Sequence, residues 1–219
     1  MKKIVYSLMA IVLIVSFTAC KSEAKPEDTV TGYFEALKAS DTSKANSFVN
    51  PKNIESSSTT SSGSDSEKAA LENNLLDYFK GNNKKVVYSI KSTDVKENSA
   101  VVTVDCKFVD ASPILKGAIA DYIPKALADA FSGTQKSDSD SAKEIAELMK
   151  DKIKSTKETF LSKTIKINCI KTADKWYIDK EDDDLKNVFS SNFVSASNDI
   201  SKSFGAAGSS DGSASSKVN

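Results

Sequence analysis

Apolar residues in the first part of the chain recur at helical spacing. The spacing i, i+3, i+4 and i+7 after Pro26 predicts a helix with four apolar residues on one face: Val30, Tyr33, Phe34 and Leu37. Asp41 can cap a second short helix that ends at Val49, because aspartate accepts hydrogen bonds from the free N–H groups of a helix start. A third helix is predicted over 67–79, and the polar run 56–66 before it predicts a solvated loop.

Further along the chain the pattern changes to alternation of apolar and polar residues, which is typical of half-buried strands. Residues 86–90 and 102–108 are predicted to form one hairpin, joined through 96–98. Residues 164–170 and 175–179 are predicted to form a second strand pair. The strands therefore belong to one antiparallel system.

Two helical segments separate the predicted strand pairs. The first, 114–131, is rich in alanine and apolar residues, and Pro124 inside it is expected to kink or split it. The second, 141–163, would be about 34 Å long at 1.5 Å per residue. Their apolar stripes comprise Ile119, Ile123, Leu127, Phe131, Ile145, Leu148, Met149 and Phe160. The stripes favour packing of the two helices against each other and the sheet, and the alternative is a groove for a ligand or partner.

The last predicted element is a short helix over 183–193. The chain length suits a single domain, placed over 26–204, and the composition of 205–219 predicts a disordered tail. The acidic run 179–184 invites a calcium interpretation, but it lacks the glycine and the distal glutamate of a calcium loop. Acids at a helix start interact favourably with the helix dipole, so the run predicts a helix N-terminus.

The first twenty residues carry a separate signal. Lys2 and Lys3 precede a short apolar run, and small residues lead from it to Cys20. The run is too short for a membrane-spanning helix, which needs about 17 to 25 residues. The arrangement resembles a bacterial lipoprotein signal peptide over 1–19, with a diacylglyceryl group on Cys20 and a tether over 20–25. It predicts a lipid-anchored protein on the extracytoplasmic face of the cell membrane, and the alternatives are simple secretion or a retained N-terminal anchor.

Composition narrows the chemistry. The chain holds 30 acidic and 30 basic residues, every basic residue is lysine, and histidine is absent. Removal of the signal peptide leaves 28 basic residues and a formal charge of −2, which attracts neither nucleic acid nor an anionic surface. Without arginine the chain has no planar guanidinium group, which binds phosphate through two parallel hydrogen bonds. Without histidine it lacks the commonest general base and the commonest zinc ligand. No cofactor, metal or nucleic-acid partner is therefore predicted.

Two cysteines remain beside Cys20. Cys106 and Cys169 each lie on the apolar face of a predicted strand. Outside the cytoplasm they can form one disulfide if their strands are adjacent. The alternative is a pair of buried free thiols that act as small apolar side chains. Alternation leaves both open, because pairing depends on the distance between the two Cα atoms.

Two short segments resemble a known fold. One is Asp-Thr-Val-Thr-Gly-Tyr-Phe-Glu-Ala-Leu-Lys at 28–38, followed by Asp41 and Ala45, and the other is Asp-Lys-Trp-Tyr-Ile-Asp at 174–179. They resemble the nuclear-transport-factor-two-like, or cystatin-like, domains of lipoproteins from Gram-positive bacteria. The resemblance implies an α+β fold, in which a curved antiparallel sheet of about four strands packs on N-terminal helices. The long helical pair inserted between the strand hairpins departs from the family pattern.

Domains of this type often have an apolar pocket at the open end of a cone formed by sheet and helix. Side-chain alternation predicts seven residues that would line this pocket: Tyr33, Phe34, Leu37, Tyr88, Val104, Phe108 and Trp176. The sequence thus predicts a non-enzymatic binding module for a small apolar ligand or an envelope protein.

Two other functions are alternatives. Some relatives of this fold transfer protons with tyrosine and aspartate, and here Asp105 could act with a hydroxyl from Tyr33, Tyr78, Tyr88, Tyr122 or Tyr177. Those tyrosines lie at core-like positions, and Asp105 is on the opposite strand face from Cys106, which favours packing roles. A transporter-associated binding lipoprotein is disfavoured, because such proteins usually have two α/β lobes and this chain has one antiparallel system.

Overall fold

The computed structural model describes residues 24–54 and 66–208, and they form an α+β fold with a four-stranded antiparallel sheet and seven helices. Two hydrophobic clusters organise these elements. The first, which we call the sheet core, is built from α1 (Pro26–Lys38), α2 (Thr42–Asn46), β1 (Val87–Lys96), β2 (Ser99–Val109), β3 (Phe160–Thr172), β4 (Lys175–Ile178) and α6 (Asp183–Phe189). The second, the helical cluster, is built from α3 (Ser66–Asn83), α4 (Ser112–Phe131), α5 (Asp138–Ser155) and α7 (Phe193–Gly208).

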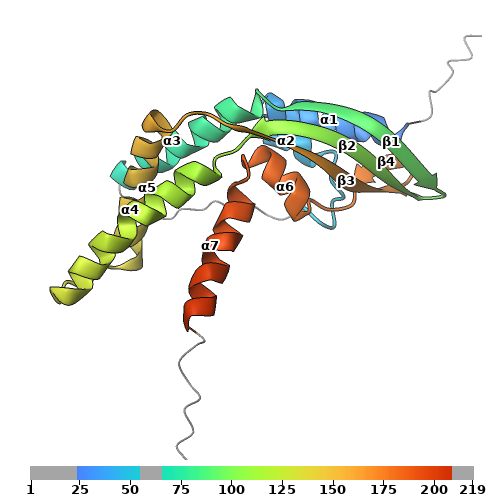
Figure 1. Cartoon of the computed structure of the whole chain (residues 1–219). Coiled ribbons are helices and arrows are strands. Elements are labelled where there is room, and N and C mark those ends of the chain that lie inside the picture. Colours follow the sequence, from blue (N-terminus) through green and yellow to red (C-terminus); the bar gives the residue numbers. More distant parts are fainter. Residues whose placement is uncertain (1–23, 55–65, 209–219) are drawn as a thin grey trace, which may run out of the picture.

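The strand order in the sheet is β1-β2-β3-β4, and every neighbouring pair is antiparallel. Both predicted hairpins are present, and α4 and α5 are inserted between them as expected. The β1–β2 turn uses Glu97 at φ 48°, and the β3–β4 turn uses Ala173 and Asp174 at φ 50° and 62°. Figure 1 shows the long strands side by side, with α3, α4, α5 and α7 gathered beyond one end of the sheet.

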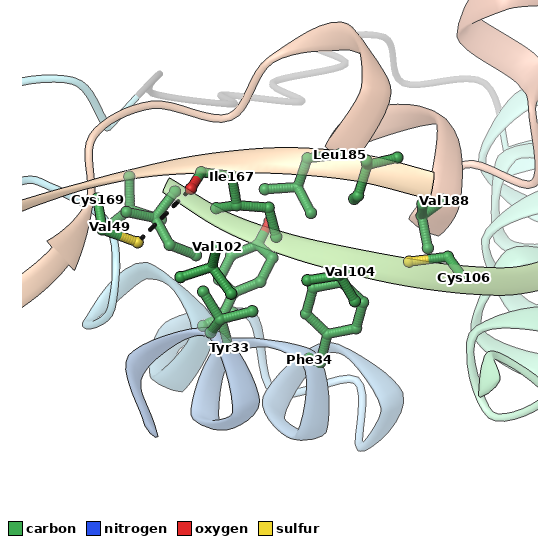
Figure 2. Close-up of a cluster of buried hydrophobic side chains, with 14 of the residues drawn as sticks. Tyr33, Phe34, Val49, Val102, Val104, Cys106, Ile167, Cys169, Leu185 and Val188 are labelled. Atoms are coloured by element: carbon green, nitrogen blue, oxygen red, sulfur yellow. Dashed lines mark hydrogen bonds between the residues drawn. The ribbon is translucent and has the colours of Figure 1, made fainter. Parts of the chain in front are cut away.

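The sheet buries one face. Alternate residues of β2 and β3 are fully buried there, among them Val102, Val104 and Ile165. α1 begins at Pro26 and covers this face with Val30 and Phe34, as its helical spacing predicts. α6 lies beside α1 on the same face, because the ring centroids of Phe34 and Phe189 are 5.0 Å apart. Figure 2 shows the side chains of both helices meeting those of β2 and β3.

The helical cluster has a smaller core. Six residues are fully buried in it: Ala111, Ile114, Leu115, Ala118, Met149 and Ala196. They come from α4, α5, α7 and the residue before α4, and side chains of α3 pack around them. In Figure 1, α4 and α5 run together away from the sheet, while α7 leaves the same region in a separate direction.

The predicted helix over 141–163 is wrong at both ends. α5 begins earlier, at Asp138, where the Ser137 side chain caps it, and it ends at Ser155. β3 begins at Phe160, which pairs with Val109 at the end of β2. Strand pairing over the whole length of β2 therefore overrides the helical periodicity of this segment. Pro124 does not split α4, which is one continuous helix.

The predicted helix over 183–193 is two helices. α6 ends at Phe189, and α7 starts at Phe193 after Ser191 and Asn192 adopt left-handed φ values of 53° and 64°. The Ser191 carbonyl accepts a hydrogen bond of 2.8 Å from the Ala111 N–H, so the turn is fixed against the start of α4. Tertiary contacts thus create a helix boundary that no glycine or proline marks.

Several predicted segments lie partly or wholly outside the residues that the structure describes. α7 continues to Gly208, so 205–208 are helical and the predicted tail over 205–219 is wrong there; 209–219 lie outside the described residues. The predicted loop 56–66 also lies outside, except for Ser66, which begins α3. The signal peptide 1–19 and Cys20 lie outside as well.

Candidate interaction surface

The seven residues assigned to a pocket lie in and against the sheet core. Five are at most 3% exposed: Tyr33, Phe34, Val104, Phe108 and Trp176. Leu37 and Tyr88 are partly buried and pack against them. The rings contact one another directly, with the centroids of Phe34 and Tyr88 4.5 Å apart. Because α1 and α6 both cover this face of the sheet, the side chains fill the space that an open cone would leave for a ligand.

The tyrosine hydroxyls on this face are hydrogen-bond donors to carboxylates. Tyr33 donates to Glu181 over 2.5 Å, and burial followed by the nearby Glu181 charge raises the pKa of Tyr33. Tyr88 donates to Glu35 over 2.9 Å, and burial together with that bond raises its pKa to about 12. Both hydroxyls hold their protons at neutral pH, which makes them anchors between elements.

Asp105 lies on the other face of the sheet. Thr164 donates a hydrogen bond of 2.6 Å to its carboxylate, and Lys91 lies 3.4 Å away. These contacts, the Thr164 bond first, lower the pKa of Asp105. Tyr88 and Asp105 both border a hollow of about 400 Å³ at this end of the sheet, but the register pairs Tyr88 with Cys106 and Asp105 with Ser89, so their side chains lie on opposite faces.

The other three candidate tyrosines are also apart from Asp105. Tyr78 packs into the helical cluster, and burial raises its pKa. Tyr122 lies half-buried on α4, and Tyr177 lies half-buried on β4. No pair of these side chains resembles an acid and base matched for proton transfer.

Cys106 and Cys169 are free and buried. Cys106 is opposite Lys163 in the β2–β3 register, whereas Cys169 is opposite Ala100, six residues further along the ladder. At about 3.3 Å per residue the two cysteines are roughly 20 Å apart, too far for the disulfide considered above. Figure 2 shows them at opposite ends of the core. Burial raises the pKa of each thiol to about 12, so both act as apolar side chains.

The acidic run before α6 forms a helix start, as predicted. The side chain of Asp182 accepts a hydrogen bond of 2.9 Å from the Leu185 N–H and caps the helix. Asp184 pairs with Lys163 at 2.6 Å, while the Asp179 side chain faces asparagine amides. Within 24–54 and 66–208, no three His, Cys, Asp or Glu side chains are grouped in a way that could hold a metal ion.

α4 separates charged from apolar residues along its length. Three of its four charged residues, 121, 125 and 129, are spaced by four, and each pairs toward α5 or the loop before it: Asp121 with Lys152 at 2.8 Å, Lys125 with Glu144 at 3.5 Å, and Asp129 with Lys136 at 2.6 Å. Its apolar residues 119, 123, 127 and 131 are also spaced by four, but they are offset by two positions. Two positions turn a helix by about 200°, so the apolar stripe points away from the ion pairs.

This stripe becomes more exposed toward the end of the helix. Ile119 is partly buried, but Ile123, Leu127 and Phe131 are 44%, 56% and 84% exposed. We call these four residues the α4 apolar face. Large apolar side chains that stand in a row on a surface are typical of interaction sites. α4 buries Ile114, Leu115 and Ala118 at its N-terminal end, so the α4 apolar face is a second apolar surface of this helix, directed outward.

A groove lies between the α4 apolar face and α7. It has a volume of about 290 Å³ and is lined by Lys116, Ile119, Ala120, Ile123, Asp199, Ile200 and Ser203. Its floor is apolar, and Lys116 and Asp199 supply opposite charges at its sides. The groove can receive one large apolar side chain at the base of the face.

Only part of this surface could be predicted from the sequence. It predicted the α4 stripe, but Met149 of α5 is fully buried, and Phe160 belongs to β3. It missed the contribution of α7, because the chain after 193 was assigned no element. The spacing of Phe193, Ala196 and Ile200 at i, i+3 and i+7 is the signal that predicts this helix.

No protein-family model and no curated protein matches the chain. Among solved structures, it is similar to a Bacillus subtilis strain 168 protein, the "putative lipoprotein" ycdA, with 19% sequence identity and a TM-score of 0.33. The similarity covers 79% of this chain and 47% of the other, so the chain spans about half the length of that relative. This likeness is too weak to carry a functional conclusion, and it does not support the cystatin-like resemblance.

Among the described helices, none is long and apolar enough to cross a bilayer.

Proposed function

We propose that this protein is a lipoprotein anchored through Cys20 at the extracytoplasmic face of the membrane, where it binds another protein through the α4 apolar face. The N-terminal signal in the sequence supports the anchor. The single observation that carries the binding role is that Ile123, Leu127 and Phe131 form an exposed row on α4, on the side away from its three ion pairs.

Energetics favour a partner on this face. Burial of apolar surface contributes about 25 cal/mol per Å², so covering three large exposed side chains gives a favourable free energy. Residues 121, 125 and 129 are paired on the other side of α4, so docking on the apolar face leaves these three charges in place, and the charges it covers are Lys116 and Asp199 beside the groove. A protein partner therefore gains the hydrophobic contribution without breaking the ion pairs of α4.

A protein partner is favoured over the small apolar ligand of the earlier prediction. The side chains once assigned to a ligand pocket fill the sheet core. The groove beside α4 is open along the helix and continues into a row of side chains, a shape that suits a helical partner. Among the described residues, the Asp105 carboxylate is bonded to Thr164 on one face of the sheet and Tyr33 is buried on the other, an arrangement that favours binding over the enzymatic alternative.

The test is a photo-crosslinking amino acid at position 127 of the full-length protein in its own membrane. We expect a covalent adduct with a protein. Leu76 on α3 is the matched control, because it is also a leucine on a helix and is 49% exposed, close to the 56% of Leu127. Absence of an adduct at 127, or equal adducts at 76 and 127, would overturn the proposal.

A separate measurement tests the anchor. Cys20→Ala removes the thiol that would carry the diacylglyceryl group, and it is expected to block lipoprotein-type cleavage so that the precursor with its signal peptide accumulates. Mass spectrometry of the mature N-terminus checks it, and an unmodified Cys20 in membrane-bound protein would contradict it.

A further inference from the structure

The α4 apolar face and its groove are complementary to each other. We propose that the partner is a second copy of this chain, joined by antiparallel packing of α4 against α4 about a two-fold axis. This inference rests on the proposed function, and it names the protein that the face binds.

The spacing of the face suits a two-fold axis. Residues 119, 123, 127 and 131 are evenly spaced, so antiparallel packing about their midpoint sets Leu127 against Ile123 of the partner subunit. The same operation sets Phe131 against Ile119 of the partner subunit. Ridges of side chains spaced by four are also the ridges that most often interdigitate between helices in globular proteins. One surface therefore serves both partners.

Phe131 and the groove form the strongest complementary pair. Phe131 stands at the C-terminal end of α4 and is the most exposed large apolar side chain of the described residues, at 84%. The groove lies at the other end of the face, where Ile119, Ile123 and Ile200 form its walls. Antiparallel packing brings the ring of each copy to the groove of the other. Each dimer would thus contain two equivalent aromatic anchors, the type of residue that dominates interface energetics.

Charge selects the antiparallel orientation. Lys116 is the one charged residue of α4 that lines the groove. In antiparallel packing it lies beside the C-terminal end of the partner's α4, so the two Lys116 side chains are at opposite ends of the contact. In parallel packing the two Lys116 side chains would lie side by side and repel. The remaining charges, at 121, 125 and 129, are engaged with Lys152, Glu144 and Lys136 away from the contact.

Two leucine variants test the inference. The full mature lipoprotein, in mild detergent, is compared with Leu127→Asp and Leu76→Asp by sedimentation analysis over a dilution series. We expect a dimer for the unchanged protein and for Leu76→Asp. Leu127→Asp is expected to raise the dissociation constant at least about tenfold, which corresponds to 1.4 kcal/mol. Equal thermal melting of the two variants shows that the fold is kept. A monomeric unchanged protein, or equal dissociation of both variants, overturns the inference.

Two tagged copies separate this inference from the proposed function. Copies with different tags are expressed together, and the photo-crosslinker is placed at position 127 in one of them. A product that contains both tags is the expected result. Adducts only with another protein would overturn the second copy as partner and leave the proposed function in place. No adduct of either kind would overturn both.

Discussion

The sheet core and the helical cluster begin with the same kind of sequence pattern and end with different surfaces. In α1 the stripe that contains Val30 and Phe34 is fully buried, because the sheet and α6 cover it. In α4 the stripe is covered only at its base, and the remainder faces outward. An apolar stripe thus predicts that a helix has a partner, and only the structure shows whether the chain supplies that partner itself.

The comparison also separates two uses of polar groups. In the sheet core, polar side chains join elements distant in sequence, as when Thr29 donates to the Trp176 carbonyl over 3.1 Å. In the helical cluster, the ion pairs of α4 are concentrated on one side, and Lys116 is the charged residue of α4 on the side of the apolar face. The hydrogen bonds of the sheet core hold distant elements in place, whereas the ion pairs of α4 leave an exposed apolar face on its other side.

The largest expected difference is between two phenylalanines. Phe34→Ala removes a fully buried ring and is expected to lower the free energy of unfolding by about 3–5 kcal/mol. Phe131→Ala removes an exposed ring, and in the monomer it is expected to change this free energy by less than about 0.5 kcal/mol. Denaturant unfolding at low protein concentration measures both. Similar losses for the two variants would remove the contrast between a closed core and an open face.

Two helical glycines provide the next test. A Cβ added at Gly32 of α1 would lie 2.4 Å from the Cζ atom of Phe48, so Gly32→Ala requires the ring to move. We expect a loss of about 1–3 kcal/mol from overpacking. A Cβ at Gly81 of α3 meets nothing within 4 Å, and Gly81→Ala is expected to stabilise the protein by about 0.5–1 kcal/mol. Thermal unfolding of both variants checks the opposite signs, and a stabilising Gly32→Ala would contradict close packing of α1.

A smaller effect is expected at the start of α6. Asp182→Ala removes the side chain that caps this helix and should lower the free energy of unfolding by about 1 kcal/mol. Asp182→Asn retains an acceptor for the Leu185 N–H and is the control. Equal losses for the two substitutions would indicate that the charge of Asp182, and not its hydrogen bond, stabilises the helix.

The smallest expected effect concerns pH at the rim of the sheet core. The pKa of Tyr88 is raised from 10.0 to about 12 in the folded state, so the folded protein holds this proton more tightly than the unfolded chain. The resulting stability is present below pH 10 and is lost as the pH rises toward 12. Tyr88→Phe should therefore lose less stability than the unchanged protein between pH 10 and 12. Parallel curves for the two proteins across that interval would show that Tyr88 does not contribute.

Much of the fold could be predicted from residue spacing. α1, the two hairpins and the inserted helical pair follow from periods of 3.6 and 2, because each element buries one face. The residues between Thr156 and Lys163 could not be assigned this way, since their apolar spacing fits a helix and strand pairing with β2 decides otherwise. The boundary between α6 and α7 was also hidden, because contacts of Ser191 with the start of α4 create it.

The candidate interaction surface could also be predicted only in part. The sequence identified Ile119, Ile123, Leu127 and Phe131 as a stripe, but it gave equal weight to α5, whose Met149 is buried. It assigned a pocket to residues such as Phe34 and Trp176 that instead fill a core. Alternation tells which side of an element is apolar, but it cannot tell whether a space remains between two apolar sides.

Residue spacing and residue types were enough to predict α1, both hairpins, the apolar stripe of α4 and a chemistry without histidine or arginine. These depend on local spacing and on residue types, which a linear chain displays. Three features could be learned only from the folded chain: the separation of the two cysteines, the groove that α7 borders, and the ion pairs from α4 toward α5. These depend on which surfaces meet, and that is settled by the packing of elements distant in sequence.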